Sequence, residues 1–295
     1  MNKNVVALFI TYNPVLETLI LSLNSIKLQV AAIVVVDNGS YNAIEIKKYC
    51  NELSISYISN KNNIGIASAT NQGVESVLCS FPDADYILLS DQDTLYPCTY
   101  IQDAFISIEQ IDCDDICAFS PNVFDSVTGV FKKLYIIKNG LVYREHLKNN
   151  CQEVFQAIAS GMLIKTNCFN YFPKMKDELF IDWVDFEWCW HVRYLGFRIM
   201  ALKSLVIKHS IGDENKKRLN ISSIHSPLRN FYIVRNGIYL SLYSEYLSIG
   251  VRWQNFIKST AYMFIFFIND MRLINARMIL KGFLRGLFSR LGKYD

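Results

Sequence analysis

The stretch Tyr86-Ile-Leu-Leu-Ser-Asp-Gln-Asp-Thr94 decides the fold of this chain and indicates its chemistry. Its apolar run, residues 86–89, has the length and composition of a fully buried strand. The run leads to Asp91 and Asp93, and open α/β sheets bind ligands where such strands end. Two carboxylates at this spacing suit a divalent cation that completes its shell with water and phosphates. The alternative is a solvated turn, because Asp and Ser are common turn residues.

The residues before this stretch alternate between strand and helix patterns. The predicted strands are residues 5–10, 32–36 and 55–58, and the predicted helices are residues 15–28, 44–53 and 64–78. Such alternation predicts an α/β fold with a doubly wound, mostly parallel sheet. Right-handed crossovers then place the strand ends, with Thr11, Asp37 and Asp91, along one edge of that sheet.

After about residue 116 the pattern changes to shorter strands with few helices. Residues 130–137 and 154–158 are the clearest of these, and residues 198–207 form a strand-like run that ends at His209. Residues 180–196 indicate a loop that leads into a helix. We therefore expect a small antiparallel sub-sheet, a main domain over residues 1–220, and a helical region over residues 221–295.

The last fifty residues are apolar and basic. Residues 256–268 are almost wholly apolar, but this run contains Lys258 and is shorter than the roughly 20 residues that a spanning helix needs. Basic residues then alternate with apolar ones up to Lys293. This pattern favours an amphipathic segment that lies on an anionic membrane surface. The alternative is an ordinary C-terminal helix that packs on the domain.

Composition excludes several classes of protein. With 295 residues and a net charge of +3, the chain has room for a large core and too little charge to indicate a nucleic-acid partner. The N-terminus lacks signal-peptide features and the eight cysteines are scattered, so we expect a cytoplasmic protein. No G-x-G-x-x-G follows the first strand and no G-x-x-x-x-G-K-[ST] occurs, which disfavours dinucleotide dehydrogenases and P-loop NTPases.

Two motifs near the predicted strand ends are candidates for nucleotide binding. Asp37 follows a buried strand, where a carboxylate can accept hydrogen bonds from a base or a ribose. Its Asp-Asn-Gly context is equally typical of a simple turn. Asn62-Asn-Ile-Gly-Ile-Ala67 precedes a helix, and its small residues would let a ligand approach the helix N-terminus. The same residues would also serve as an ordinary helix cap.

Three further groups carry possible chemistry. Asp182-Trp-Val-Asp-Phe-Glu-Trp188 sets acids among aromatic rings, which can raise a carboxylate's pKa and poise it as a general base. Acids are also common at helix starts for the sake of the dipole. His209 could complete a metal shell, although a lone histidine is more often structural. Residues 229, 232 and 235 share a helical face that can bind diphosphate or form a basic stripe.

Taken together, these segments resemble the inverting family 2 glycosyltransferases of the GT-A fold, and among them the bacterial L-rhamnosyltransferases of O-antigen and polysaccharide synthesis. The resemblance covers about residues 5–237. Its motifs, in chain order, are Thr11-Tyr-Asn-Pro14, Val36-Asp-Asn-Gly-Ser40, Asn62-Asn-Ile-Gly-Ile-Ala67, Asp91-Gln-Asp93, Ser160-Gly-Met162, Phe180-Ile-Asp-Trp-Val-Asp-Phe-Glu-Trp-Cys189, His209-Ser-Ile-Gly212 and His225-Ser-Pro-Leu-Arg-Asn-Phe-Tyr-Ile-Val-Arg-Asn236.

The resemblance implies a role for each matching residue. It assigns catalysis to Asp185 as the base and to Glu187, which would support the acceptor or the base, although Val184 replaces the usual Glu before Asp185. It assigns the acceptor to Asp182, Trp183 and Trp188. Residues 1–95 would be the nucleotide-sugar half and residues 96–220 the acceptor half. The metal ligands would be Asp91, Asp93 and His209. The nucleotide-sugar residues would be Thr11, Tyr12, Asn13, Asp37, Asn63, Gly65, Asp91, Gln92, Arg229, Tyr232 and Arg235.

The implied reaction is a single displacement with Mg²⁺ or Mn²⁺. The donor would be dTDP-β-L-rhamnose, and the acceptor a growing glycan on undecaprenyl diphosphate at the inner face of the inner membrane. A UDP-hexose donor is an alternative, and so is a non-catalytic membrane-associated scaffold. A nucleotidyltransferase is disfavoured, because Pro14-Val-Leu-Glu17 is not the Gly-rich basic loop of that class.

Overall fold

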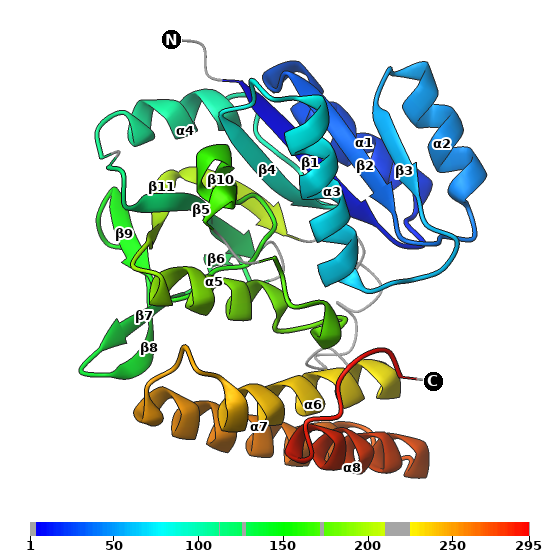
Figure 1. The fold of residues 1–295 in the computed structure, drawn as a ribbon, viewed down its shortest axis with the longest axis vertical. Coiled ribbons are helices and arrows are strands. Elements are labelled where there is room, and N and C mark those ends of the chain that lie inside the picture. Colours follow the sequence, from blue (N-terminus) through cyan, green and yellow to red (C-terminus); the bar gives the residue numbers. More distant parts are fainter. Residues whose placement is uncertain (1–3, 112, 126–127, 172–173, 210–224, 295) are drawn as a thin grey trace.

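The computed structural model describes residues 4–111, 113–125, 128–171, 174–209 and 225–294, with the side chains of Asn170 and His209 left aside. These residues form a broad α/β domain built on one large sheet, and a layer of three helices beside it (Figure 1). We call α6 (Pro227–Tyr243), α7 (Ile249–Asn269) and α8 (Leu273–Leu287) the C-terminal helical layer.

The central sheet has the order β3-β2-β1-β4-β10-β5-β11-β9 across the described residues, with β6 paired to β5. The first four strands in this order are parallel, whereas β10, β9 and β6 run antiparallel to their neighbours. Its strands are β1 (Val5–Thr11), β2 (Ala32–Asp37), β3 (Ser56–Ser59), β4 (Tyr86–Asp91), β5 (Ile116–Asp125), β6 (Val130–Phe131), β9 (Cys151–Val154), β10 (Leu163–Lys165) and β11 (Arg198–His209). The separate small sheet pairs β7 (Leu134–Lys138) with β8 (Leu141–Glu145).

The register of β1 brings the predicted strand ends together. Thr11 lies opposite Asp37 on β2, and Ile10 lies opposite Asp91 on β4. All three strands are parallel, so their carboxyl ends share one edge, as the sequence predicts.

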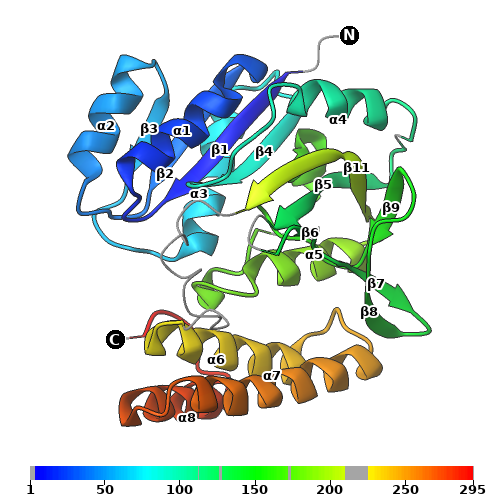
Figure 2. The same cartoon turned by 180° about the vertical axis from the view of Figure 1, so that it is seen from behind.

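Helices cover both faces of the sheet because the β1 side chains alternate between them. Val6 and Leu8 pack with α3 (Ile66–Ser80) and α5 (Val184–Tyr194), whereas Ala7 and Phe9 pack with α1 (Leu16–Ile26) and α4 (Tyr100–Ile108). The view from behind shows α1 on the face opposite α3 (Figure 2). α2 (Ala43–Glu52) packs beside β3. This doubly wound arrangement confirms the predicted fold class.

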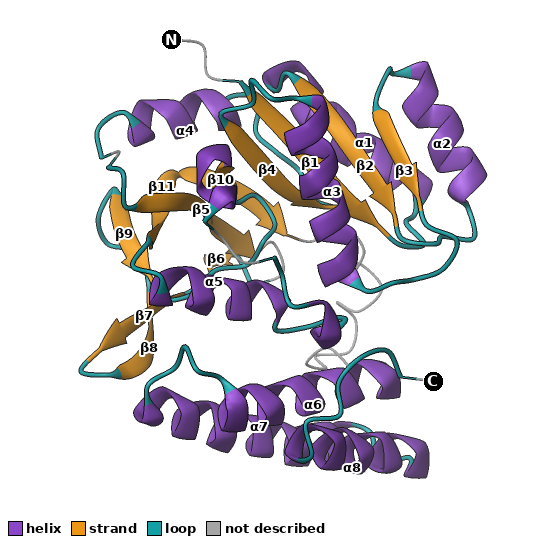
Figure 3. Ribbon diagram, viewed as in Figure 1, coloured by secondary structure: helices purple, strands orange, loops and turns teal. Residues whose placement is uncertain are grey.

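The C-terminal helical layer is tightly packed within itself. A Cβ on Gly282 of α8 would lie 2.6 Å from the Phe231 carbonyl oxygen, and one on Gly286 would clash with the Arg235 carbonyl oxygen. Glycine at these two positions therefore lets α6 and α8 approach closely. The layer is wholly helical and lies below α5 (Figure 3). Among the helices in the described ranges, none has both the length and the hydropathy that crossing a bilayer requires.

Two strand predictions were wrong in detail. The predicted strand 130–137 is two strands, because β6 turns back on β5 while β7 pairs with β8. The predicted strand 154–158 ends at Val154, after which Gln156 forms only an isolated bridge to Tyr135. α4 and the three-residue β10 had no counterpart in the prediction.

Candidate active site

A cleft of about 250 Å³ opens at the carboxyl edge of β1 and β4. It contains most of the residues that the sequence assigns to the nucleotide sugar and the metal. Its lining is Ile10, Thr11, Tyr12, Asn38, Asn63, Gly65, Ile66, Asp91, Gln92, Asp93, Phe180 and Ile181. We call it the donor cleft.

Side-chain hydrogen bonds hold the loops that form the donor cleft. Gln92 Oε1 accepts from the Tyr12 backbone N–H at 2.8 Å, which joins the ends of β1 and β4. Asn63 Oδ1 accepts from the Gly65 N–H at 2.9 Å and from Asn38 Nδ2 at 3.1 Å. Gly65 has a φ of +90°, and a Cβ there would lie 2.7 Å from the Phe180 carbonyl oxygen. Only glycine fits this position without strain.

The residues Asp37 and Asn13 lie beside the donor cleft rather than on its wall. Asp37 is fully buried, and its carboxylate accepts from Thr11 Oγ1 and the Ser40 N–H, both at 3.2 Å. Asn13 joins the same turn, since its N–H donates to Ser40 Oγ at 2.8 Å. In this structure both residues brace the strand ends, and the neighbouring Asn38, which the sequence analysis did not single out, faces the cleft.

A strained loop separates the donor cleft from a second pocket. Phe180, Asp182 and Trp183 have positive φ values of 65°, 61° and 67° although none of them is glycine. Each such residue costs on the order of 1–3 kcal/mol and persists only when its surroundings impose it. Phe180 lines the donor cleft, and Asp182 and Trp183 line the second pocket. The loop is thus a shared wall.

Two adjacent side chains of α6 hold this loop in place. Asn236 Nδ2 donates to the carbonyl oxygens of Leu179, Ile181 and Asp182 at 2.9, 2.8 and 3.0 Å. Arg235 donates to the Leu179 carbonyl at 2.8 Å and to that of Glu178 at 3.1 Å. These bonds supply the tertiary constraint that the strained backbone needs.

The face of α6 that was predicted to contact the diphosphate is largely buried in this structure. Arg235 is 0% exposed, and burial lowers the pKa of its guanidinium to about 10. Tyr232 is also buried, stacks on Phe180 at 5.0 Å, and accepts from the Tyr294 N–H at 2.8 Å. Arg229 pairs with Asp182 at 3.1 Å. Tyr232 and Arg235 therefore contact the loop and the C-terminal tail, whereas Arg229 stays exposed.

Asp185 lies at the start of α5, directly after the strained loop. Its Oδ1 accepts from the Phe186 N–H at 2.9 Å. Burial raises the pKa of this carboxyl to about 7, with further contributions from the negative charges of Asp91 and Asp182. Because Asp91 belongs to the donor cleft and Asp182 to the second pocket, Asp185 is electrostatically coupled to both. A carboxylate of this pKa is suited to take a proton near neutral pH.

The structure does not bring Glu187 together with Asp185. Two residues along an α-helix correspond to a rotation of about 200°, so the two acids point to different sides of α5. Glu187 is 3% exposed, and burial raises its pKa to about 7 while the Lys176 ammonium opposes the shift. Its surroundings are those of a buried structural acid.

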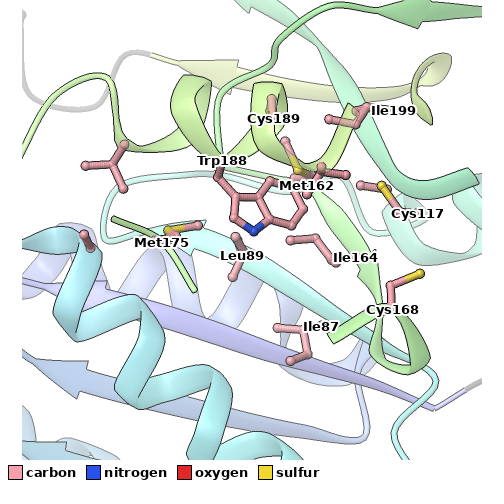
Figure 4. Packing of buried hydrophobic residues seen from close by; sticks show 14 of the residues in the cluster. Ile87, Leu89, Cys117, Met162, Ile164, Cys168, Met175, Trp188, Cys189 and Ile199 are labelled. Carbon is pink, nitrogen blue, oxygen red and sulfur yellow. The ribbon is translucent and has the colours of Figure 1, made fainter. Parts of the chain in front are cut away.

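Two of the three predicted acceptor residues line the second pocket, which has a volume of about 260 Å³. Asp182 and Trp183 line it, and Trp183 Nε1 donates to the Ile233 carbonyl at 3.0 Å. Trp188 instead lies in the core among Leu89, Met162 and Met175 (Figure 4). The full lining is Tyr135, Asp182, Trp183, Phe186, His225, Ile233, Lys258, Tyr262 and Phe266.

The carboxylates at the end of β4 could supply some of the ligands of a divalent cation. Asp91 and Asp93 both line the donor cleft, whereas the side chain of His209 lies outside the described part of the chain. Among the described residues, no group of three His, Cys, Asp or Glu side chains forms a ready-made metal site. Mg²⁺ is commonly bound by one or two carboxylates together with water and substrate phosphates, and Asp91 and Asp93 could supply the carboxylates.

The C-terminal tail also reaches the donor cleft, which no sequence signal indicates. Lys293 Nζ donates to the Asn63 carbonyl oxygen at 3.1 Å, and the Gly292 N–H donates to the Glu178 carbonyl at 2.8 Å. A lysine 230 residues away in the sequence thus brings a positive charge beside the cleft.

Comparison with solved structures agrees with this architecture. GalNAc-T7 with UDP, GalNAc and Mn²⁺ matches 97% of this chain and 56% of its own with a TM-score of 0.59 at 12% identity. TarS residues 1–349 of S. aureus in complex with UDP-GlcNAc matches 96% of this chain and 81% of its own, with a TM-score of 0.59 at 16% identity. The protein thus shares the GT-A fold of these structures.

Sequence comparison identifies the family. The family described as "Glycosyl transferase family 2" matches residues 7–172, and the chain belongs to this family. The dTDP-rhamnosyl transferase RfbF of Shigella flexneri is 31% identical over 249 residues, which cover 81% of this chain and 80% of that protein. Family membership makes the chain an enzyme that transfers a sugar, rather than a scaffold.

Proposed function

We propose that this enzyme transfers L-rhamnose from dTDP-β-L-rhamnose to a hydroxyl of a lipid-linked glycan, with inversion at the anomeric carbon. The observation that carries the proposal is the position of Asp185 in the first turn of α5, directly after the loop whose residues line both the donor cleft and the second pocket. The rhamnosyl donor is supported by the 31% identity to a dTDP-rhamnosyl transferase over most of both chains.

The nucleotide-sugar donor would bind in the cleft at the carboxyl ends of β1 and β4. Thr11, Tyr12 and Asn38 line the part of the cleft where the nucleoside would bind, and Asp91 and Asp93 would face its diphosphate. Mg²⁺ or Mn²⁺ on these two acids would stabilise the charge that develops on the leaving dTDP. Lys293 adds a cation at the same cleft.

The chemical step needs a base on the acceptor side, and Asp185 meets this requirement. Its carboxylate takes the proton of the acceptor hydroxyl while that oxygen bonds to the anomeric carbon and the bond to dTDP breaks. One displacement from the face opposite the leaving group converts the β-linked donor into an α-L-rhamnoside. Asn236 and Arg235 are positioning residues, because they hold the loop that sets the location of Asp185.

A membrane surface is the expected location of a lipid-linked acceptor. Four apolar side chains of α7, Trp253, Ile257, Phe264 and Ile268, are 62–69% exposed. Exposed apolar residues on a helix, with basic residues nearby, are typical of segments that lie in a membrane interface. We therefore propose peripheral binding to the cytoplasmic face of the inner membrane through α7 and α8.

The experiment that tests the proposal is a donor screen with the full chain. Purified protein is incubated with dTDP-L-rhamnose, UDP-glucose, UDP-galactose and UDP-N-acetylglucosamine, with Mg²⁺, Mn²⁺ or a chelator, and nucleoside diphosphate release is measured. We expect metal-dependent release from dTDP-L-rhamnose. Release from a UDP-hexose alone would refute the rhamnosyl donor while leaving the glycosyltransferase family unaffected.

A further inference from the structure

Lys258 of α7 has an unusual environment in the second pocket. Its Nζ lies 5.4 Å from the ring centroid of Tyr135, 5.4 Å from that of Trp183 and 5.6 Å from that of Tyr262. The three rings come from β7, from the strained loop and from α7 itself. An ammonium within about 6 Å of an aromatic face is attracted to it, so the rings hold the lysine in the pocket.

The charge of Lys258 has no carboxylate partner among the described residues. Asp182 lines the same pocket, but it is paired with Arg229 at 3.1 Å. A second cation is close by, since the guanidinium of Arg144 lies 5.4 Å from the Tyr135 ring. Burial, followed by the Arg144 charge, lowers the pKa of Lys258. Two cations beside one ring repel each other unless an anion joins them.

The pocket also lies close to the donor cleft and to the proposed base. The strained loop divides it from the donor cleft, and Asp185 follows that loop. The ring of Phe186, the next residue, packs against Tyr135 at 5.6 Å and Trp183 at 6.2 Å. On the other side, α7 continues from Tyr262 to the exposed Phe264 and Ile268. An acceptor here would have its sugar near Asp185 and its lipid along α7.

We propose that the second pocket binds the phosphate or diphosphate group that joins the acceptor's sugar to its lipid, with Lys258 as the principal ligand. Arg144 supplies the second positive charge, and the aromatic walls exclude water and face the sugar. This proposal rests on the proposed function, because it names the anionic group of that acceptor. Charge-assisted bonds in a half-buried site are among the stronger hydrogen bonds, so the loss of one should weaken binding about tenfold or more.

The test measures binding rather than turnover. The full chain is saturated with dTDP and Mg²⁺ to fill the donor cleft, and is then titrated calorimetrically with farnesyl diphosphate or with farnesol, which has the same chain without the charge. We expect the wild type to bind the diphosphate about tenfold tighter than the alcohol. Lys258→Met should remove most of this preference, and Lys258→Arg should retain it.

A matched control is Lys281→Met. Lys281 of α8 also lies over a ring, 5.6 Å from that of Tyr294, but outside the pocket. We expect this variant to bind farnesyl diphosphate as the wild type does, and thermal unfolding verifies that all variants are folded. Equal binding of farnesyl diphosphate by wild type and Lys258→Met would overturn the proposal.

Two further comparisons complete the test. The first distinguishes an acceptor phosphate from a membrane headgroup as the bound anion, and the second distinguishes this inference from the proposed function. Binding to phosphatidylglycerol vesicles should fall equally in Lys258→Met and Lys281→Met; a loss confined to Lys258→Met would identify a membrane headgroup as the ligand and overturn the acceptor assignment. Selective farnesyl diphosphate binding without rhamnose transfer would refute only the proposed function. Rhamnose transfer without such binding would refute only this inference.

Discussion

Replacement of Asp185 by Asn tests the proposed chemistry most directly. Asn has nearly the same shape, and its side-chain oxygen can still accept from the Phe186 N–H, which Asp185 does at 2.9 Å. The start of α5 should therefore keep its structure. What the variant loses is a group that can take a proton.

The expected loss of activity follows from the role of a general base. Such groups contribute about 10²–10⁴-fold to a rate, which corresponds to about 3–5 kcal/mol of transition-state stabilisation. Because burial raises the pKa of Asp185 to about 7, the wild-type rate should rise with pH up to about 7 and then level off. In Asp185→Asn the rate should be low throughout, and this rise should be absent.

Although Asp185→Asn should lose activity, its free energy of unfolding should be higher than that of the wild type at high pH. The folded protein keeps the Asp185 proton up to about pH 7, whereas the unfolded chain loses it near 3.8, so stability falls between these pH values as pH rises. The full difference corresponds to about 4 kcal/mol, and partial exposure of the side chain reduces it to about 1–2 kcal/mol. Asp185→Asn should thus be more stable than the wild type at pH 8, and less so at pH 5.

The assay combines initial rates of dTDP release between about pH 5 and about pH 8 with urea unfolding at both ends of that range. Glu187→Gln is the matched control, because its carboxyl has a similar pKa and is buried on another side of α5. It should gain stability at pH 8 with less than about a tenfold loss of rate. Wild-type turnover in a folded Asp185→Asn, or an unchanged rise of rate with pH, would refute the assignment of the base.

Three further predictions concern the metal, the loop and the membrane. Asp93→Asn should lower turnover about 10²-fold and abolish its dependence on divalent cations, measured as dTDP release against metal concentration; unchanged metal dependence would contradict the assignment. Asn236→Ala removes three hydrogen bonds to the strained loop and should lower the free energy of unfolding by about 2–4 kcal/mol in a urea titration, whereas a loss below about 0.5 kcal/mol would show that the bonds do not hold the loop. Phe264→Ser combined with Ile268→Ser should reduce sedimentation with anionic vesicles while changing stability by about 0.5 kcal/mol or less, and unaltered sedimentation would exclude this face as the contact.

The parallel half of the fold could be predicted because its strands are buried on both faces. Residues of β1, β2 and β4 are apolar almost without interruption, and such runs are visible in a sequence with their order intact. The second half gives weaker signals. β6 is exposed and has two residues, and β10 has three, so neither is long enough to show a period.

Candidate site residues that lie in one short motif could be predicted from the sequence. Contacts between elements that are distant in the sequence could not. Asp91, Asp93 and Asp185 each lie in a short motif at the end or start of an element. Helical periodicity predicts that Arg229 and Arg235 share one face of α6, but it does not say what that face contacts, and in the structure Arg229 is exposed while Arg235 is buried. The structure gives this face to the strained loop and the C-terminal tail, which no local pattern specifies.

The family match covers the donor cleft and the second pocket to different extents, which bears on substrate specificity. The family match ends at residue 172, so it includes the β1 and β4 edge of the donor cleft but not the strained loop, α5 or the C-terminal helical layer. Of the residues that line the second pocket, Tyr135 is the one within the matched region. Relatives can therefore share the donor chemistry while their later residues shape a different acceptor pocket. Because α6 holds the loop that lines both pockets, the C-terminal helical layer should position Asp185, the proposed base, in addition to any contact with the membrane.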